Sequence, residues 1–264
     1  MPPSRVEPII DDWQAHGRYV FTRDDLRAEI GKWDTATRDA LRRLTKDARL
    51  ARPRVGFYVI VPLEYRSAGS PPASWFVDPL MAYLGQPYYV GLLTAASLHG
   101  AAHHRPQEFQ VLTDRPTRVA RAGRVRIRFV VNSSIGHTTV ESIKTVTGSM
   151  RVSTPEATAF DLVRHVDAAG GYDNVAGVLA GLAERIDSGE LAEQADRVPS
   201  VVARRTGYLL ETAGAGQVAR ALAERFSGTD VEPQPLEPGR SKRGAQRDDR
   251  WGLYVNTIVE PEPS

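Results

Sequence analysis

The 264-residue chain contains no cysteine, which excludes disulfides, thiolate chemistry and cysteine-based zinc sites. No apolar run approaches the ~20 residues that a membrane-spanning helix needs. The N-terminus, MPPSRVEPIIDDW, also lacks an apolar core of signal-peptide length. These absences predict a cytoplasmic protein with no membrane partner. Lysine is scarce as well, since arginine makes up 30 of the 34 basic residues.

The composition is that of a globular protein, with 41% hydrophobic and 25% charged residues. The net charge is only +2, so any nucleic-acid contact should be a local patch rather than the whole surface. The length allows two ordinary domains. We predict an α+β protein in which residues 1–75 form a winged helix-turn-helix domain, with a linker at about 62–75. Residues 76–264 would then form a larger mixed α/β domain.

Residues 22–62 predict a short helix, a glycine-containing turn, a basic helix and a basic hairpin. Thr22 and Asp25 have the spacing of a capping box, and Gly31 is suited to end the first helix. Asp34 or Thr35 would begin the second helix. A helix at 5–16 and a strand at 19–21 would complete a winged helix-turn-helix.

One face of the second helix carries basic residues at steps of four, four and three, because Arg38, Arg42, Lys46 and Arg49 follow that spacing. From Arg38 to Arg54 there are seven Lys or Arg and two Asp, a local net charge of +5. Such a helix beside a basic wing can follow the phosphates of a DNA groove. The alternative is a solvated face, enriched in arginine by genome composition. The candidate DNA contacts are Thr35, Thr37, Arg38, Arg42, Arg43, Lys46, Arg49, Arg52 and Arg54.

The remainder of the chain predicts alternating helices and strands. Helices are expected at 79–84, 88–100, from 154, and near 173–187, 199–212 and 215–226, and strands at 109–113, 124–131 and 251–259. Residues 228–250 are polar and rich in Pro and Gly, and we expect them to be extended or mobile.

A second basic cluster precedes and enters the strand at 124–131, where arginine alternates with apolar residues. Its members are Arg115, Arg118, Arg121, Arg124, Arg126 and Arg128. So dense a cluster can bind nucleic acid or an acidic protein surface. The alternative is an ordinary exposed face.

Signs of catalysis are weak. His99 and His103 are four apart in the motif HGAAHH, which also includes His104, but the segment contains no carboxylate, so we expect no metal site. The GxGxxA-like run at 214–219 follows a helical pattern rather than a strand, which indicates a helix-to-helix turn. No nucleophile elbow, Walker loop or kinase motif is present. We therefore predict a protein that is not an enzyme and needs no cofactor.

Several segments together resemble the AbiEi family of antitoxins from bacterial AbiE-type (type IV) toxin–antitoxin operons. They are GFYVIVP at the end of the winged helix, YYVGLLTAASLHGAAHHRPQEFQVLT, STPEATAFDLV and RRTGYLLE. The resemblance covers the chain from about Thr22 to about Val259. It implies an N-terminal domain that binds inverted repeats in its own promoter and represses the operon. It also implies a C-terminal domain that counters a nucleotidyltransferase-like toxin, directly or indirectly.

The resemblance implies double-stranded operator DNA as a partner and places DNA contacts on the basic helix and the wing. It supplies no equally specific motif for the antitoxic surface, and the assignment of that surface to the second arginine cluster is a physical inference. Two alternatives remain open. One is a transcription regulator whose second domain senses a small ligand, and the other is an enzyme fused to a DNA-binding module.

Overall fold

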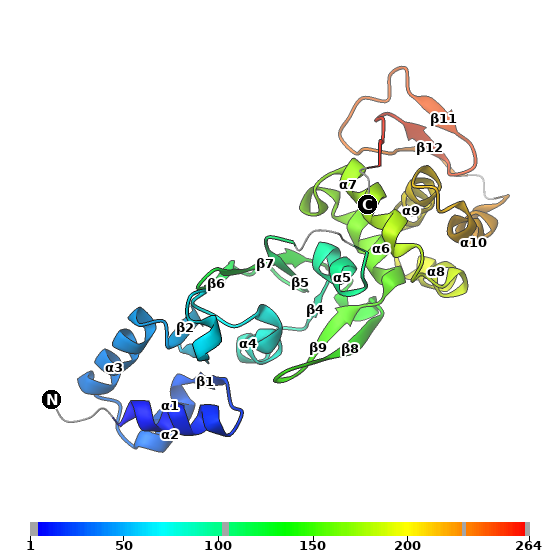
Figure 1. Cartoon of the computed structure of the whole chain (residues 1–264). Coiled ribbons are helices and arrows are strands. Elements are labelled where there is room, and N and C mark those ends of the chain that lie inside the picture. The colour runs from blue at the N-terminus through cyan, green and yellow to red at the C-terminus, as the bar shows by residue number, and fades with distance from the viewer. Residues whose placement is uncertain (1–4, 102–105, 229–230, 262–264) are drawn as a thin grey trace. The chain divides into compact units, whose positions relative to one another are not determined.

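The computed structural model describes residues 5–101, 106–228 and 231–261 (Figure 1). By its internal contacts the chain divides into two compact units. The first contains residues 1–89, 107–135 and 142–151, and the second contains residues 90–106, 136–141 and 152–264. The predicted division at about residue 75 falls inside the first unit and, as a boundary between sequence modules, remains a prediction.

The first unit begins with three helices and a three-stranded antiparallel sheet of order β1-β3-β2. The elements are α1 (Val6–Ala15), β1 (Val20–Thr22), α2 (Arg23–Ile30), α3 (Thr35–Lys46), β2 (Leu50–Arg54) and β3 (Phe57–Ile60). β1 pairs with the wing strand β3, with Phe21 opposite Tyr58. This is the predicted order of a winged helix-turn-helix, and the predicted α+β class is confirmed.

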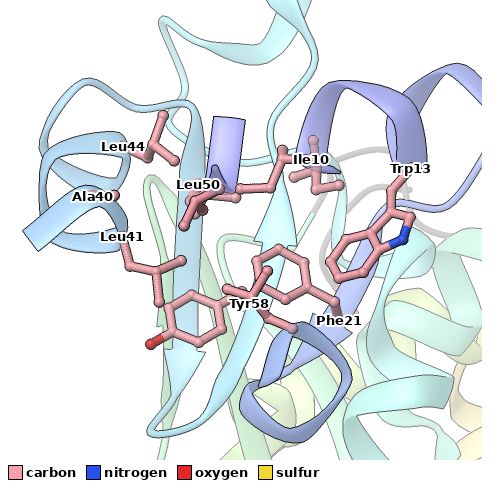
Figure 2. Packing of buried hydrophobic residues seen from close by; sticks show 11 residues of the cluster. Ile10, Trp13, Phe21, Ala40, Leu41, Leu44, Leu50 and Tyr58 are labelled. Atoms are coloured by element: carbon pink, nitrogen blue, oxygen red, sulfur yellow. The ribbon is translucent and has the colours of Figure 1, made fainter. Parts of the chain in front are cut away.

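The core of this winged helix lies between the helices and the sheet (Figure 2). Ile10 and Trp13 of α1 and Leu44 of α3 belong to one buried cluster, in which the rings of Phe21 and Tyr58 stack with centroids 5.1 Å apart. Burying large apolar side chains stabilises such a domain by about 1.5–3 kcal/mol each. The core therefore fixes which face of α3 is turned outward.

Local signals set the helix boundaries. Thr22 and Asp25 form a reciprocal capping box, in which the Thr22 amide donates to Asp25 Oδ2 at 2.7 Å and the Asp25 amide donates to Thr22 Oγ1 at 3.1 Å. Gly31 ends α2 in the left-handed region at φ +70°. The helical spacing of the apolar residues Ala40, Leu41 and Leu44 predicts that Ala48 continues the same stripe. This expectation was wrong, because α3 ends at Lys46 and Ala48 has φ +52°.

The segment predicted as a linker is packed in the first unit. It contains two short 3-10 helices, η1 (Leu63–Tyr65) and η2 (Ala73–Trp75). The Trp75 ring contacts the rings of Tyr19 and Tyr65, with centroids 5.0 and 5.4 Å away. Its proline, glycine and serine residues thus form turns rather than a free tether.

A six-stranded sheet follows, with strand order β6-β7-β5-β4-β9-β8. Its strands are β4 (Tyr88–Val90), β5 (Phe109–Thr113), β6 (Ala120–Ala122), β7 (Val125–Val131), β8 (Val140–Thr145) and β9 (Gly148–Ser153). β5 and β7 are parallel, with Phe109 opposite Ile127, and β6 is antiparallel to β7. The predicted strands at 109–113 and 124–131 are confirmed. In β7, Ile127 is buried and Arg126 is exposed, as the alternation predicts.

The single helix predicted at 88–100 was wrong in its first part. Residues 88–90 form β4, and the helix α5 (Leu92–Leu98) begins after Gly91. Val90 pairs with Val152, a residue far along the chain. A largely apolar run does not reveal such a partner, so its periodicity cannot separate a buried strand from a buried helix.

The second unit contains most of the remaining helices. They are α6 (Pro155–Arg164), η4 (Val166–Ala169), α7 (Tyr172–Leu182), α8 (Ser188–Gln194), η5 (Ala195–Arg197), α9 (Ser200–Thr212) and α10 (Gly216–Phe226). Thr154 caps α6 and Pro155 occupies its first turn, as predicted. α4 (Val77–Leu84) lies in the first unit, and η3 (Ile135–His137) precedes β8. α7 ends earlier than predicted, and α8 was not predicted.

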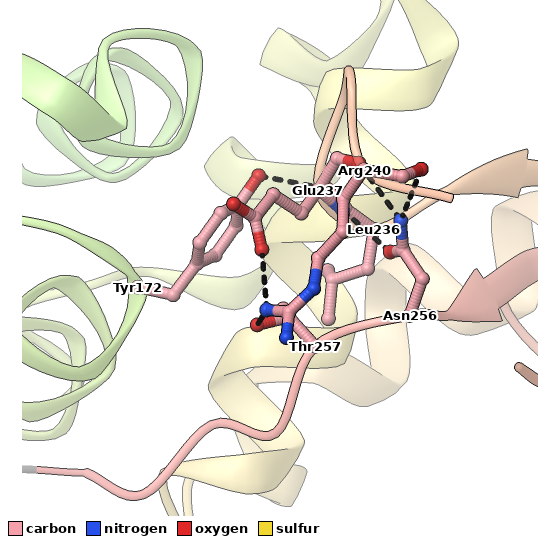
Figure 3. A network of polar contacts seen from close by, with 6 residues as sticks. All are labelled: Tyr172, Leu236, Glu237, Arg240, Asn256 and Thr257. Atoms are coloured by element: carbon pink, nitrogen blue, oxygen red, sulfur yellow. Dashed lines mark hydrogen bonds and ion pairs between the residues drawn. The ribbon is translucent and has the colours of Figure 1, made fainter. Parts of the chain in front are cut away.

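The C-terminal segment forms a small sheet of order β10-β12-β11 (Gln234–Pro235, Leu253–Val255, Gln246–Asp248). Trp251 is fully buried against Gly207 of α9, where an added Cβ would lie 2.0 Å from the Trp251 ring. Polar contacts hold the same segment: Tyr172 Oη donates to the Leu236 carbonyl at 2.8 Å, and Asn256 Nδ2 donates to the Glu237 carbonyl at 2.9 Å (Figure 3). The expected extended region at 228–250 therefore contributes strands to a fixed sheet. Within the described residues, no helix has the length and apolar character to cross a membrane.

Candidate functional site

The outward face of α3 presents three basic side chains, from Arg38, Arg42 and Lys46, all of them exposed. Arg38 Nη2 donates to Thr35 Oγ1 at 3.0 Å. Arg42 forms an ion pair of 3.1 Å with Asp39, yet 82% of its side chain stays exposed. Exposed pairs of this kind stabilise little, so all three cations remain available to an anionic partner.

Thr37 differs from the other predicted DNA contacts because only 7% of it is exposed. Its amide and hydroxyl both donate to Asp34 Oδ1, at 2.9 and 3.0 Å. The hydrogen bond from the Thr37 amide, followed by that from its hydroxyl, lowers the pKa of the Asp34 carboxyl. Thr37 therefore holds the start of α3, while Thr35 is exposed at the same end.

Arg43 and Arg49 connect α3 and its following turn to α1. Glu7 accepts from Arg43 Nη2 at 2.5 Å and from Arg49 Nη1 at 3.1 Å, and Asp11 accepts from Arg49 Nη2 at 2.5 Å. The Arg49 side chain is only 25% exposed. Arg49 also lies beyond the end of α3, so its sequence spacing does not place it on the helix face. These two arginines brace the fold and are partly neutralised.

The wing presents two arginines in different surroundings. Arg52 is exposed, whereas Arg54 is half-buried and donates to the main-chain carbonyl of Arg118 and, at 3.0 Å, to that of Val119. Burial and then the Arg118 charge lower the pKa of the Arg54 guanidinium. The wing is thus attached to the β5–β6 loop, and Arg52 is its freely exposed cation.

The tip of the wing is held on the other side by Tyr83 of α4. Tyr83 Oη donates to the Val55 carbonyl at 2.9 Å, and the Tyr83 ring lies 5.4 Å from that of Phe57. Gly56 turns the hairpin at φ +84°, and an added Cβ would lie 2.6 Å from Tyr83 Oη. The Val55 side chain is 72% exposed at this tip.

The second arginine cluster is divided by Glu108, a residue that sequence reasoning missed. Arg126 and Arg128 of β7 lie 2.6 and 3.7 Å from its carboxylate oxygens. Arg126 is also opposite Arg121 of β6, and like charges in opposed positions repel. Glu108 relieves that repulsion. Glu108 lies one residue before the predicted strand at 109–113, and this position was the signal that could have suggested its pairing with the arginines.

The other four arginines of the cluster lie on the β5–β6 loop, on β6 and on the β6–β7 turn. Arg115 Nη2 donates to the Gly85 carbonyl at 3.2 Å. Arg118, Arg121 and Arg124 are exposed, and within the described part of the chain none of their side chains forms an ion pair with a carboxylate. The cluster therefore combines two paired arginines with exposed, uncompensated ones.

The histidine motif does not form a site among the residues that the structure describes. The His99 side chain is only 8% exposed, with Nε2 2.8 Å from the Ser153 carbonyl and Nδ1 3.7 Å from Glu141. His103 and His104 lie outside the described residues. Within the described ranges, no group of three or more His, Asp or Glu side chains could hold a metal.

The GxGxxA-like run at 214–219 connects α9 to α10, with Gly214 at φ +82°. Its preceding element is a helix, so the strand that a dinucleotide site requires is missing. The predicted helix-to-helix turn is confirmed.

Comparison with known proteins gives a family match for the central part of the chain. Residues 89–212 match the family model described as the AbiEi antitoxin C-terminal domain. The crystal structure of the RV2827C protein from Mycobacterium tuberculosis is similar, with a TM-score of 0.67 and 16% sequence identity, over 95% of this chain and 91% of that chain. At this identity the similarity shows a shared fold. A search of curated proteins gave no match.

Proposed function

We propose that the chain, whose residues 89–212 match the AbiEi antitoxin C-terminal domain model, is an antitoxin that represses its own operon. In this proposal the winged helix binds double-stranded promoter DNA. The C-terminal domain counters a toxin that resembles a nucleotidyltransferase. The protein acts by binding and performs no catalysis of its own.

The observation that carries the DNA-binding half is the exposed row of Arg38, Arg42 and Lys46 on α3. The core turns this face outward, and Arg52 is exposed on the adjacent wing. In helix-turn-helix proteins the second helix enters the major groove with its N-terminal residues toward the base edges. Thr35 and Arg38 occupy that end. Arg42, Lys46 and Arg52 then contact phosphates, while Arg43, Arg49 and Arg54 support the scaffold.

The test is a gel-shift titration of the chain's own promoter DNA at fixed salt. Replacing Arg38 and Arg42 together by Ala is expected to weaken binding by about 1–3 kcal/mol for each contact removed. Arg66→Ala is the matched control, because Arg66 is an exposed arginine outside the winged helix. Unchanged affinity in the double variant would refute the assignment of the recognition helix.

The contribution of charge to DNA affinity can be measured separately by repeating the wild-type titration at several salt concentrations. A duplex contact through phosphates releases counterions, so log K should fall linearly with log salt by about 0.9 per phosphate contacted. A flat response would mean that the basic face does not contact phosphates.

For the antitoxic half, we propose that the exposed arginines of the second cluster contact an acidic surface of the toxin. Arg121 and Arg124 are uncompensated, whereas Arg126 and Arg128 are held by Glu108. Charge reversal of Arg121 and Arg124 to Glu should abolish rescue of growth when toxin and antitoxin are co-expressed. Arg66→Glu is the control, and full rescue by the double variant would place the antitoxic surface elsewhere.

A further inference from the structure

A cleft of about 490 Å³ lies beside the wing, in the first unit. Its walls come from the wing hairpin, from the segment after α4 and from the β5–β6 loop. Its polar lining consists of Arg52, Arg54, Gln86, Thr117 and Arg118, beside the apolar Val55. A volume of this size falls within the range of about 300–1,000 Å³ typical of small-molecule sites.

The lining is strongly cationic. Three arginines line this cleft, Arg52, Arg54 and Arg118, and the described lining residues include no Asp or Glu. Burial and the nearby Arg118 charge both oppose the charged form of Arg54, which is why the pKa of Arg54 is lowered. Like charges gathered without a carboxylate favour the entry of an anion.

The polar groups of the cleft are mainly donors. Arg54 uses only part of its guanidinium on the carbonyls of Pro53, Arg118 and Val119, because five N–H donors are present and its Nε–H is not used in those bonds. Thr117 Oγ1 donates to Gln86 Oε1 at 2.7 Å, so the acceptor of this amide is occupied and its NH₂ group is left as a donor. An array of guanidinium and amide donors suits an anion with several oxygen acceptors.

We propose that this cleft binds a phosphate group, and that its source is a free organic phosphate of the nucleotide class. Phosphate matches the arginine fork in geometry and accepts charge-assisted hydrogen bonds from more than one guanidinium. Val55 and the prolines Pro53 and Pro116 add apolar walls against which the organic part can lie.

Occupation of the cleft should also affect DNA binding, and this consequence rests on the proposed function. Arg52 and Arg54 both belong to β2, the strand that leads into the wing tip. A bound phosphate would neutralise positive charge beside the duplex and reduce affinity for the operator. Coupling of this kind is reciprocal, so operator DNA would weaken binding of the free phosphate equally.

The direct test is isothermal titration of the full chain, without DNA, with ATP and separately with inorganic pyrophosphate at constant ionic strength. We expect saturable binding with one ligand per chain. Arg118→Glu should weaken it about tenfold or more, because it puts a carboxylate in the cleft in place of a charge-assisted donor. Arg121→Glu is the matched control: it makes the same charge change on an exposed arginine of β6 that does not line the cleft, and its affinity should stay within about twofold.

Absence of saturable binding would overturn the proposal. Equal losses of affinity in Arg118→Glu and Arg121→Glu would also overturn it, because they would show that the ligand responds to overall positive charge rather than to the cleft. A second arm measures operator affinity for the same variants. One outcome is that the chain without DNA binds neither ATP nor pyrophosphate, while Arg118→Glu weakens DNA binding. In that case the cleft receives a phosphate of the duplex, and the proposal of a free organic phosphate is wrong. Because the titration contains no DNA, failure of the DNA-binding proposal would leave its result unaffected.

Discussion

Arginine has opposite roles on α3 and on α9. The side chains of Arg38 and Arg42 of α3 are exposed, and they interact with Thr35 and Asp39 of their own helix. Arg205 of α9 is half-buried, and its Nε and Nη2 both donate to the Pro235 carbonyl at 3.1 and 2.7 Å. Arg38 and Arg42 are available to a binding partner, whereas Arg205 holds the C-terminal segment in place. An arginine-rich composition therefore indicates neither role until the packing around each side chain is known.

Arg204, next to Arg205, shows how far the structural role extends. Only 4% of it is exposed, and its Nη1 donates to the carbonyls of Trp251 and Gly252 at 3.4 and 3.0 Å. Burial and the adjacent Arg205 charge lower the pKa of this guanidinium. On α9, positive charge serves to hold carbonyl oxygens of the C-terminal segment.

The largest expected effect is at Trp251, the side chain that the α9 arginines help to position. Trp251→Ala should lower the free energy of unfolding by about 3–5 kcal/mol, because it removes a fully buried aromatic ring. Chemical denaturation followed by circular dichroism measures this. Trp251→Phe retains most of the packing and loses the Nε1–H bond to Glu211 at 2.6 Å, so it should cost clearly less. Equal losses in the two variants would mean that ring packing does not hold the segment.

Changing one arginine on α9 and one on α3 tests whether the two helices use arginine differently. Arg205→Ala should lower the free energy of unfolding by about 1.5–3 kcal/mol, the usual value of hydrogen bonds from a charged group. Arg38→Ala should change it by less than about 0.5 kcal/mol, as exposed substitutions do. Denaturation midpoints for both variants, beside the operator titration above, measure the two roles independently. A large stability loss in Arg38→Ala would remove the distinction between the two regions.

A smaller loss of stability than at Arg205 is expected at Glu7, which joins α1 to Arg43 and Arg49. Glu7→Gln should lower the free energy of unfolding by about 0.5 kcal/mol, since both ion pairs are partly exposed. Operator affinity should not fall, because no cation of the α3 face is removed. Asp24→Asn is a suitable control, as Asp24 is an exposed acid of the same winged helix. A marked loss of DNA binding in Glu7→Gln would show that the brace also positions α3.

Local signals were sufficient for the winged helix. The capping box at Thr22, the left-handed Gly31 and the Asp34 cap each depend on residues within a few positions, so the sequence reveals them. The basic face of α3 followed from helical spacing up to Lys46. The same spacing misplaced Arg49, because the left-handed Ala48 turns the chain immediately before it.

Interactions between distant segments could not be predicted in this way. β4 lies between β5 and β9, where Val90 pairs with Val152, and the role of Arg54 depends on carbonyls of the β5–β6 loop. Likewise, the sequence does not show that Arg126 is paired while other arginines of the second cluster are not, because this depends on where Glu108 lies relative to β7. Each of these pairings joins residues brought together only by folding.

The sequence by itself determined the helix boundaries of the winged helix, the apolar stripe that orients α3 and the alternation of β7, because these depend on neighbouring residues and on the helix and strand periods. Tertiary structure alone decided which arginines are exposed and which are bound. Burial and hydrogen bonding depend on what packs against a side chain, and for Arg54, Arg126 and Arg204 those neighbours come from other segments of the chain.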